Sequence, residues 1–275
     1  MSVKQARRIT IITSTFNCAK DFKKTADSIR SQSYNHIQWI VVDGKSSDNT
    51  VEIIRENNDI ISNWMSESDQ GIYDAWNKAC RFIDGDWVLF LGAGDVFNDE
   101  MALLTFWNLA PEYCEQYSLI YGNVYISKSD GKLRYLSRKP RLNYWEYGRV
   151  ALPNHQGVFH RANLFQSDKS FDASLKIVGD SKFMMQALQI SGAYHIDIVL
   201  SRMQDDGISN NRSSVRVARR EIKKVCKDLN IKVPLSSRLY AQIRDSFYLL
   251  GYTIIPSRLI DFLKQWNDTL RRSKL

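Results

Sequence analysis

Five polar residues stand where apolar, strand-like runs of the sequence end, and their types could bind a polar ligand. They are Thr15, Asn17, Asp43, Asp69 and Asp95. Ligands of parallel α/β sheets bind at the carboxyl ends of the strands, so we expect these side chains to gather on one edge of a sheet. Asp43 directly follows the run "WIVV", which would hold its carboxylate over that edge, where it could hydrogen-bond a uridine or a ribose.

The stretch "VLFLGAGD" is an apolar run that loses its side-chain bulk at residues 92–94 and then presents one carboxylate, Asp95. One carboxylate can hold Mg²⁺ or Mn²⁺ in a phosphate site, because phosphate oxygens and water supply most of the other ligands. The two glycines would let a diphosphate approach the backbone closely. Alternatively, Asp95 caps the helix predicted after it, and Asp48 likewise has an ordinary interpretation as a loop and N-cap residue.

Alternating strand and helix patterns fill the first hundred residues and would position these side chains. β-Branched runs predict the strands, and apolar residues at helical spacing predict the helices between them. The predicted strands are 9–16, 37–44, 61–68 and 85–95, and the predicted helices are 19–32, 48–58 and 71–83. This alternation favours an α/β fold with a mainly parallel sheet and helices on both of its faces.

The pattern changes after about residue 99. We expect a helix at 102–110, an antiparallel pair at 118–127 and 132–139, a strand and short helix at 154–165, a helix at 178–192 and a strand at 194–204. From Arg212 onward, basic and apolar residues alternate in helical periods. This segment holds 15 Lys and Arg against 5 Asp and Glu, so the net charge of +8 arises in the tail.

Composition favours one large domain, since 275 residues that are 44% hydrophobic can bury a substantial core. The four cysteines are far apart and form no CxxC pair, which predicts free thiols in a reducing cytosol. The short apolar run near the N-terminus is typical of a first strand rather than a signal segment. No stretch approaches the roughly 20 apolar residues of a membrane-spanning helix, so we expect a cytoplasmic protein.

Four motifs in this order and spacing together resemble the family 2 glycosyltransferases, which have the GT-A fold. They are "TIITSTFN", "WIVVDGKSSDNT", "SESDQGIYDAWNKA" and "GDWVLFLGAGD". The third motif is similar to the branch that builds bacterial surface polysaccharides such as O-antigens. The resemblance is strong over residues 8–100 and weaker to about 210. It implies a catalytic domain at 1–211, with a nucleotide-sugar half at about 8–100 and an acceptor half at about 101–211, and a basic helical extension at 212–275.

The resemblance implies roles for the strand-end residues on the donor side. Thr15 and Asn17 would line the nucleotide pocket, Asp43 would contact the uracil or ribose, and Asp69 would border the same site. Asn77 matches an Asn that the family keeps behind that pocket. Two neighbours of Asn77 stay open: Trp76 stands where many members have Arg, and both Tyr73 and Trp76 could equally be core residues at helical spacing.

The metal site of the family is a DxD-type motif, which is reduced here to Gly92-Ala93-Gly94-Asp95. The resemblance implies that Asp95 holds Mn²⁺ or Mg²⁺ against the donor diphosphate.

The resemblance also implies residues for the transfer step. Asp180, which opens the predicted helix at 178–192, matches the base that deprotonates the acceptor hydroxyl, and its alternative role as an N-cap is compatible with this. His155 and Gln156 match a His-Gln pair on the acceptor side. The remaining histidines have no neighbouring Gln of this kind and are expected to be structural. The segment "QDDGISNNR" is similar to the family's mobile loop, in which Gly207 and Ser209 would close over the donor.

These expectations combine into an inverting transfer of a sugar from a UDP-sugar to a saccharide acceptor or a lipid-diphosphate-linked saccharide acceptor. Rival interpretations are an enzyme of the same fold with another nucleotide or no metal, and a catalytically silent, membrane-associated scaffold. Nucleic acid is not expected as a partner, because the basic tail contains no recognisable RNA or DNA module.

The tail carries an apolar stripe with basic margins, formed by Leu259, Phe262, Leu263 and Trp266. This pattern suits a helix on the inner face of an anionic membrane, or equally one that packs on a protein surface.

Overall fold

A computed structural model gives the structure of the chain and describes residues 7–127, 133–137, 145–146, 149–165, 170–204, 212–235 and 237. The chain divides into two compact units, Met1–Pro140 with Leu152–Val225 and Arg141–Ala151 with Cys226–Leu275. The domain boundary predicted between residues 211 and 212 follows directly on residues 205–211, which lie outside the described residues. That boundary stays a prediction.

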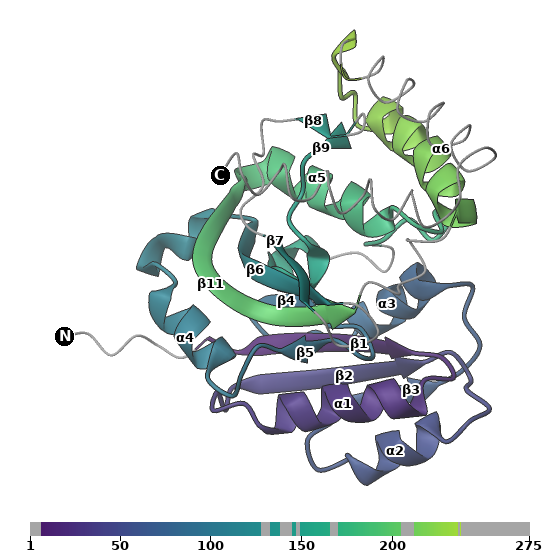
Figure 1. Cartoon of the computed structure of the whole chain (residues 1–275), viewed down its shortest axis with the longest axis vertical. Helices are drawn as coiled ribbons and strands as arrows, with labels where there is room; N and C mark the ends of the chain where they lie inside the picture. The colour runs from purple at the N-terminus through teal and green to yellow at the C-terminus, as the bar shows by residue number, and fades with distance from the viewer. Residues whose placement is uncertain are drawn as a thin grey trace. The chain divides into compact units, whose positions relative to one another are not determined.

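The first half of the sheet is parallel, as the alternating pattern predicts. Its strands are β1 (Ile9–Thr15), β2 (Ile37–Asp43), β3 (Asn63–Ser66) and β4 (Trp87–Phe90), and they lie in the order β3-β2-β1-β4. The register pairs Thr15 with Asp43 and Ile12 with Phe90. The carboxyl ends of β1, β2 and β4 therefore meet at one edge of the sheet (Figure 1).

The second half continues the same nine-stranded sheet in the order β4-β10-β6-β11-β5. Its strands are β5 (Val96–Phe97), β6 (Leu119–Ser127), β7 (Leu133–Ser137), β10 (Val158–Arg161) and β11 (Ala193–Gln204). Only β6 and β11 are parallel here, while β10, β7 and β5 are antiparallel to their neighbours. The predicted antiparallel pair is confirmed by β6 and β7, and the sheet is mixed in this half, where the strands no longer alternate with helices.

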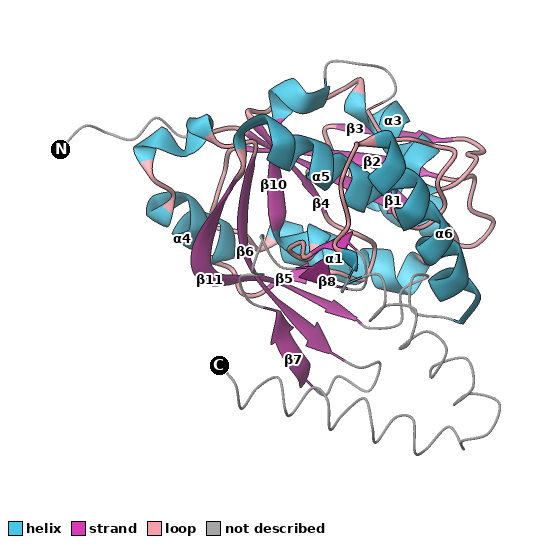
Figure 2. Ribbon diagram, turned by 90° about the horizontal axis from the view of Figure 1, so that it is seen from above, coloured by secondary structure: helices cyan, strands magenta, loops and turns pink. Residues whose placement is uncertain are grey.

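Helices cover both faces of the sheet, as Figure 2 shows from above. The described α-helices are α1 (Ala19–Arg30), α2 (Thr50–Glu56), α3 (Ile72–Cys80), α4 (Ala102–Leu109), α5 (Gly179–Ser191) and α6 (Arg212–Asp228), of which α6 contacts the loop before α5 rather than the sheet. Short 3₁₀ turns lie at η1 (Glu112–Gln116), η2 (His155–Gly157) and η3 (Ala162–Phe165). The second unit contains a two-stranded sheet of β8 (Trp145–Glu146) and β9 (Arg149–Val150).

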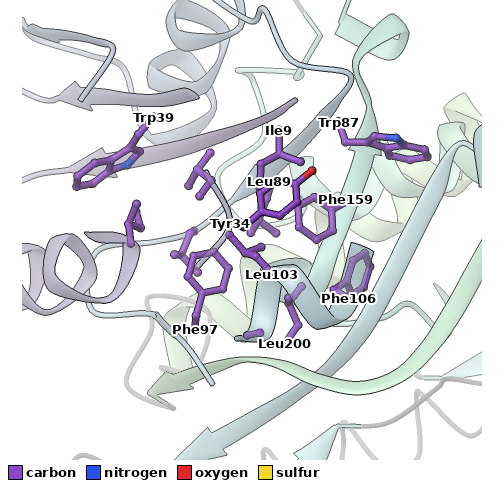
Figure 3. Packing of buried hydrophobic residues seen from close by; sticks show 14 of the residues in the cluster. Ile9, Tyr34, Trp39, Trp87, Leu89, Phe97, Leu103, Phe106, Phe159 and Leu200 are labelled. Carbon is purple, nitrogen blue, oxygen red and sulfur yellow. The ribbon is translucent and has the colours of Figure 1, made fainter. Parts of the chain in front are cut away.

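The main core lies between the sheet and helices α1 and α4 (Figure 3). Alternate strand residues such as Ile9, Trp39 and Leu89 point to this face, because successive side chains of a strand point to opposite faces. Phe22 of α1 stacks on Trp39 with ring centroids 5.5 Å apart. Phe106 of α4 is fully buried in the same cluster. The other face carries Phe90, which packs against α3, so the two faces of β4 serve different helices.

All four cysteines are free thiols, as their spacing predicts. Among the described residues, no helix is both long enough and apolar enough to cross a membrane. The apolar stripe at residues 259–266 lies outside the described residues, as do Gly207 and Ser209.

Candidate active site

Asp43 is the centre of a hydrogen-bonded network at the end of β2, and its side chain has no exposed surface. Its carboxylate accepts hydrogen bonds from the hydroxyls of Thr15 at 2.9 Å and Ser66 at 2.6 Å. The backbone N–H of Ser46 donates a further bond of 2.8 Å. Burial alone would raise the pKa of Asp43, but the bonds from Ser46, Ser66 and Thr15 outweigh it and hold the pKa below its usual value. Asp43 therefore stays charged and orders the loop that follows β2.

Asn17 ties the loop after β1 to the loop after β2. It adopts a left-handed backbone conformation with φ of 48°, which Asn tolerates better than most residues. Its side-chain oxygen accepts the Ser47 N–H at 2.8 Å, and its own N–H donates to the Ser46 hydroxyl at 2.8 Å. Asp48 accepts the N–H groups of Ala19 and Thr50, the first residues of α1 and α2, as expected of a loop residue. The N-cap position of α2 is Asn49 and not Asp48.

Asp69 lies beside the same loop. One of its carboxylate oxygens accepts the Gly71 N–H at 2.9 Å. The other lies only 2.6 Å from the position that a Cβ atom on Gly44 would take, so a larger residue at 44 would displace it. Thr15, Asn17, Asp43 and Asp69 thus lie within one set of contacting loops. The serine donors Ser46 and Ser66 were not singled out from the sequence, because serines at loop positions carry no distinguishing pattern.

Asp95 is a nearly buried carboxylate just beyond β4. It accepts the Gly92 N–H at 3.1 Å and a hydrogen bond from the Gln156 side chain. Burial raises the pKa of Asp95 to about 7, more than these two bonds lower it. Among the described residues, no Lys or Arg forms an ion pair with Asp95.

A buried carboxylate oxygen without a cationic partner fits a hard divalent ion. The described residues contain no group of three or more His, Cys, Asp or Glu that could hold a metal by itself. A cation held here would therefore draw its other ligands from elsewhere, as the reduced motif predicts.

His155 lies beside Gln156 in an aromatic cluster. Its ring stacks on Phe90 at 5.2 Å and packs against Trp76 at the same centroid distance. Burial lowers the pKa of His155 to about 3, so the ring is neutral at physiological pH. A neutral imidazole can form hydrogen bonds but forms no ion pair. The Nε2 atom of His155 is buried and has no hydrogen-bond partner among the described residues.

The other histidines make structural contacts. His160 is fully buried and approaches the Val88 carbonyl, and His195 contacts the Asn123 side chain at 2.9 Å. His36 packs edge-on to Tyr34.

Asp180 lies in the first turn of α5 and contacts α3. The Tyr73 hydroxyl donates to its carboxylate at 3.2 Å. Burial, followed by the charge of Asp180, raises the pKa of Tyr73 well above its usual range, so the phenol keeps its proton. A Cβ atom on Gly179 would lie 2.8 Å from the Tyr73 ring, so only glycine lets the ring pack this closely.

Helix α3 joins the donor and acceptor halves. Besides Tyr73, it contributes Asn77, whose amide is fully paired with the backbone of Phe171: the side-chain NH₂ donates to the carbonyl at 2.9 Å, and the N–H of Phe171 donates back at 2.8 Å. Trp76 contacts His155 and donates to the Ser14 hydroxyl at 3.3 Å. Tyr73 and Trp76 are buried core residues, as one of the two interpretations expects, and they also contact candidate site residues.

These contacts form one continuous series from Asp95 through Gln156 and its neighbour His155 to α3, and from α3 to Asp180. They involve the carboxyl ends of β1 and β4, through Ser14 and Phe90. This arrangement is typical of enzymes that bind a nucleotide across a parallel sheet edge.

Comparison with known proteins identifies the class of enzyme. The sequence model of glycosyl transferase family 2 matches residues 10–174, more than half of the chain. The chain therefore belongs to glycosyl transferase family 2 and is a glycosyltransferase. A PGL/p-HBAD biosynthesis glycosyltransferase of Mycobacterium bovis is 26% identical over 245 residues, which cover 85% of this chain and 87% of the relative. A second relative is the Escherichia coli UDP-Glc:alpha-D-GlcNAc-diphosphoundecaprenol beta-1,3-glucosyltransferase WfaP. It is 27% identical over a region that covers 50% of this chain and 53% of the length of WfaP.

Solved structures agree on the fold. S. aureus TarS in complex with UDP-GlcNAc superposes with a TM-score of 0.66 at 17% identity, covering 94% of this chain and 78% of TarS. The mannosyltransferase PcManGT of Pyrobaculum calidifontis, solved with GDP-Man and Mn²⁺, superposes with a TM-score of 0.59 at 16% identity, covering 97% and 81%. The predicted GT-A fold is thereby confirmed.

Proposed function

We propose that this glycosyltransferase transfers a sugar, with inversion, from a UDP-sugar to a saccharide acceptor that is carried on a lipid diphosphate. The observation that carries the proposal is the series of contacts linking Asp95 and Asp180 through α3. A leaving group and a base must lie on opposite sides of the reacting carbon in an inverting transfer, and two carboxylates held apart by one rigid helix can serve these two tasks.

The donor side is assigned to the loops after β1, β2 and β3. Thr15, Asn17, Asp43 and Asp69 are proposed to bind the uridine part. Asp43 acts there by fixing its loop, since its carboxylate is already fully engaged. Asn77 supports the site from behind through its pairing with Phe171.

Asp95 is proposed to hold Mn²⁺ or Mg²⁺. Bound there, the ion would neutralise the negative charge that develops on the departing diphosphate. The Gln156 side chain, which donates to Asp95, orients the carboxylate. A neutral, buried His155 beside it packs against Phe90 and against Trp76 of α3 without adding charge.

Asp180 is proposed as the base. As the acceptor hydroxyl attacks the anomeric carbon, its proton passes to the Asp180 carboxylate, the new oxygen–carbon bond forms and the bond to the diphosphate breaks. UDP then leaves with the bonding electrons. The helix N-terminus stabilises the charged carboxylate before the transfer.

The lipid-linked acceptor is proposed because the relative WfaP is named for an undecaprenol-diphosphate acceptor. Such an acceptor would bring the enzyme to the inner face of the cell membrane. Synthesis of a bacterial surface polysaccharide is the process that uses this kind of acceptor.

The test is incubation of the purified chain with UDP-glucose, UDP-N-acetylglucosamine, UDP-galactose and GDP-mannose, each with GlcNAc-diphosphoundecaprenol and with Mn²⁺ or EDTA. We expect one UDP-sugar to yield a product one hexose heavier by mass spectrometry, in the presence of Mn²⁺ only. Turnover with GDP-mannose alone, or equal turnover in EDTA, would contradict the donor or the metal assignment respectively.

The base assignment has a separate test. We expect Asp180→Asn to lower kcat by about 10²-fold to 10⁴-fold, which is the usual contribution of a positioned base, while UDP still binds. Calorimetric titration with UDP and Mn²⁺ measures the binding, and Glu100→Gln, which neutralises an exposed carboxylate, is the control. An Asp180→Asn enzyme with normal kcat would remove Asp180 from the reaction.

A further inference from the structure

One carboxylate of α6 binds three successive backbone N–H groups of the loop that leads into α5. The Oε1 atom of Glu221 accepts the N–H of Lys176 at 2.7 Å. Its Oε2 atom accepts the N–H groups of Ile177 at 3.0 Å and Val178 at 3.1 Å. Successive N–H groups that converge on one point form an anion-binding concavity, and here an internal carboxylate fills it.

This contact belongs to the first compact unit, although the sequence places Glu221 in a basic extension. Helices α5 and α6 lie side by side in Figures 1 and 2. Ile222 and Val225 of α6 are buried, and Lys224 of the same helix donates to the Ser174 hydroxyl at 3.3 Å, close to the loop that Glu221 binds. Glu221 therefore belongs to a helix with buried residues, which limits how far its side chain can move.

The loop that Glu221 binds is the one that carries Asp180. Val178 caps α5, and Asp180 follows two residues later in the first turn. Other parts of the loop are fixed as well, by Asn77 at Phe171 and by the ion pair of Asp172 with Lys182 at 2.7 Å. Of these contacts along the loop, those of Glu221 lie nearest in sequence to Asp180, apart from the contacts of Tyr73 with Gly179 and Asp180 themselves.

We propose that Glu221 is a positioning residue for the transfer reaction: it fixes the backbone of residues 176–178 and thereby the place of the Asp180 carboxylate. The inference rests on the proposed role of Asp180 as the base. A shift of about 1 Å in a reacting group can cost on the order of 10²-fold in rate, so a loosened loop should lower kcat and leave donor binding intact. On this account α6 is part of the catalytic unit.

The test uses Glu221→Gln in the full chain. Glutamine keeps the size of the side chain but replaces one acceptor oxygen by an NH₂ group, which cannot accept a backbone N–H. With the nucleotide sugar that the wild type turns over fastest, we expect kcat to fall about 10-fold to 100-fold while the donor KM changes less than threefold. Lys223→Gln removes an exposed charge from the same helix and should leave both values unchanged.

Hydrogen exchange provides a readout that does not depend on turnover. The amides of 176–178 should exchange at least 10-fold faster in Glu221→Gln than in the wild type or in Lys223→Gln. If Glu221→Gln does not fold, Glu221→Asp, which keeps the charge but shortens the reach, is measured in the same way.

The outcomes separate this inference from the proposed function. Wild-type kcat in Glu221→Gln together with an inactive Asp180→Asn overturns the inference alone, as does unchanged exchange at 176–178. A fully active Asp180→Asn overturns the base assignment instead. In the Asp180→Asn background, Glu221→Gln should cause no further loss of kcat, since Glu221 acts through Asp180; a further loss as large as in the wild type would overturn the inference.

Discussion

Two carboxylates, at the ends of the strands on either side of β1, show how hydrogen bonds decide the charge of a buried group. Both Asp43 and Asp95 lose their contact with water, which by itself raises a carboxyl pKa. Asp43 has donors on both oxygens, from Thr15, Ser46 and Ser66, and its pKa is lowered. Asp95 has two donors, and its pKa is raised to about 7. Asp43 is therefore a charged structural group, whereas the charged form of Asp95 would be stabilised most by a bound cation.

The raised pKa of Asp95 makes a prediction for stability. A carboxyl whose pKa is higher in the folded state favours folding when it is protonated, so its contribution is lost as pH rises from about 4 through about 7. We expect Asp95→Asn to be more stable than the wild type at pH 8 in EDTA, by up to a few kcal/mol at about 1.4 kcal/mol per pKa unit, and nearly equal to it at pH 4.

Thermal melts between pH 4 and pH 8 measure this difference. In the presence of UDP, which supplies the diphosphate, Mn²⁺ at pH 8 should raise the Tm of the wild type and cause no such rise in Asp95→Asn, because only the wild type keeps the charged ligand. Glu100→Gln changes an exposed carboxylate and serves as the matched control. A difference in Tm that is the same at all pH values would refute the account of Asp95.

At the scale of elements, helix α3 does more than cover the sheet. Three of its side chains, Tyr73, Trp76 and Asn77, each contact a different segment of the acceptor half: Asp180, His155 and Phe171 respectively. These three fit on one face of the helix, because positions three and four apart are neighbours on a helix surface. The helix thus couples the donor-side strands to the residues proposed for the transfer step.

The approach of α5 to α3 depends on Gly179. A methyl group there would meet the buried Tyr73 ring at 2.8 Å, and overpacking of this kind costs about 1 to 3 kcal/mol. We expect Gly179→Ala to lower the free energy of unfolding by that amount and to lower kcat, since Asp180 is the next residue. Urea unfolding and steady-state kinetics measure the two effects.

The control for Gly179→Ala is Ile190→Ala, which truncates a side chain of α5 that is 68% exposed. It should change neither the free energy of unfolding nor kcat appreciably. Wild-type stability and kcat in Gly179→Ala would show that α5 can move away from Tyr73 without consequence.

At the scale of the whole molecule, the main hydrophobic core and the candidate site residues lie at different parts of the sheet. Helices α1 and α4 bury the main core on one face, and the candidate site residues lie at the strand ends and toward α3 and α5. Helix α1 touches the Asp95 loop through Thr25, whereas the ring of Phe106 in α4 packs against Trp107 and Phe159. A change at Phe106 should therefore affect stability more than activity.

Phe106→Ala tests this separation. Truncation of a fully buried Phe costs about 3 to 5 kcal/mol, so we expect a large loss in the urea midpoint with an unchanged donor KM in the protein that remains folded. Leu109→Ala, in the same helix but 56% exposed, should lose less than about 1 kcal/mol. If Phe106→Ala changed the donor KM by as large a factor as Asp180→Asn changes kcat, the separation of stability from activity would be contradicted.

Much of the fold was predictable because local patterns dictate it. The run at 37–44 corresponds to β2 at Ile37–Asp43, and the helical spacing at 71–83 corresponds to α3 at Ile72–Cys80. The polar residues at strand ends could be selected as site candidates, because the carboxyl ends of parallel strands meet at one edge. The mixed half of the sheet was less accessible, since β5 and β10 pair with strands far away in sequence.

The sequence by itself determined the family, the parallel half of the sheet and the carboxylates proposed for the chemistry, because a short run of adjacent residues specifies each of them. Only the tertiary structure decided how those groups are held: Asn77 pairs with a backbone 94 residues away, Tyr73 donates to a carboxylate 107 residues away, and Glu221 binds a loop 43 to 45 residues away. Contacts of this kind follow from the packing of whole helices, and no local pattern of residues specifies them.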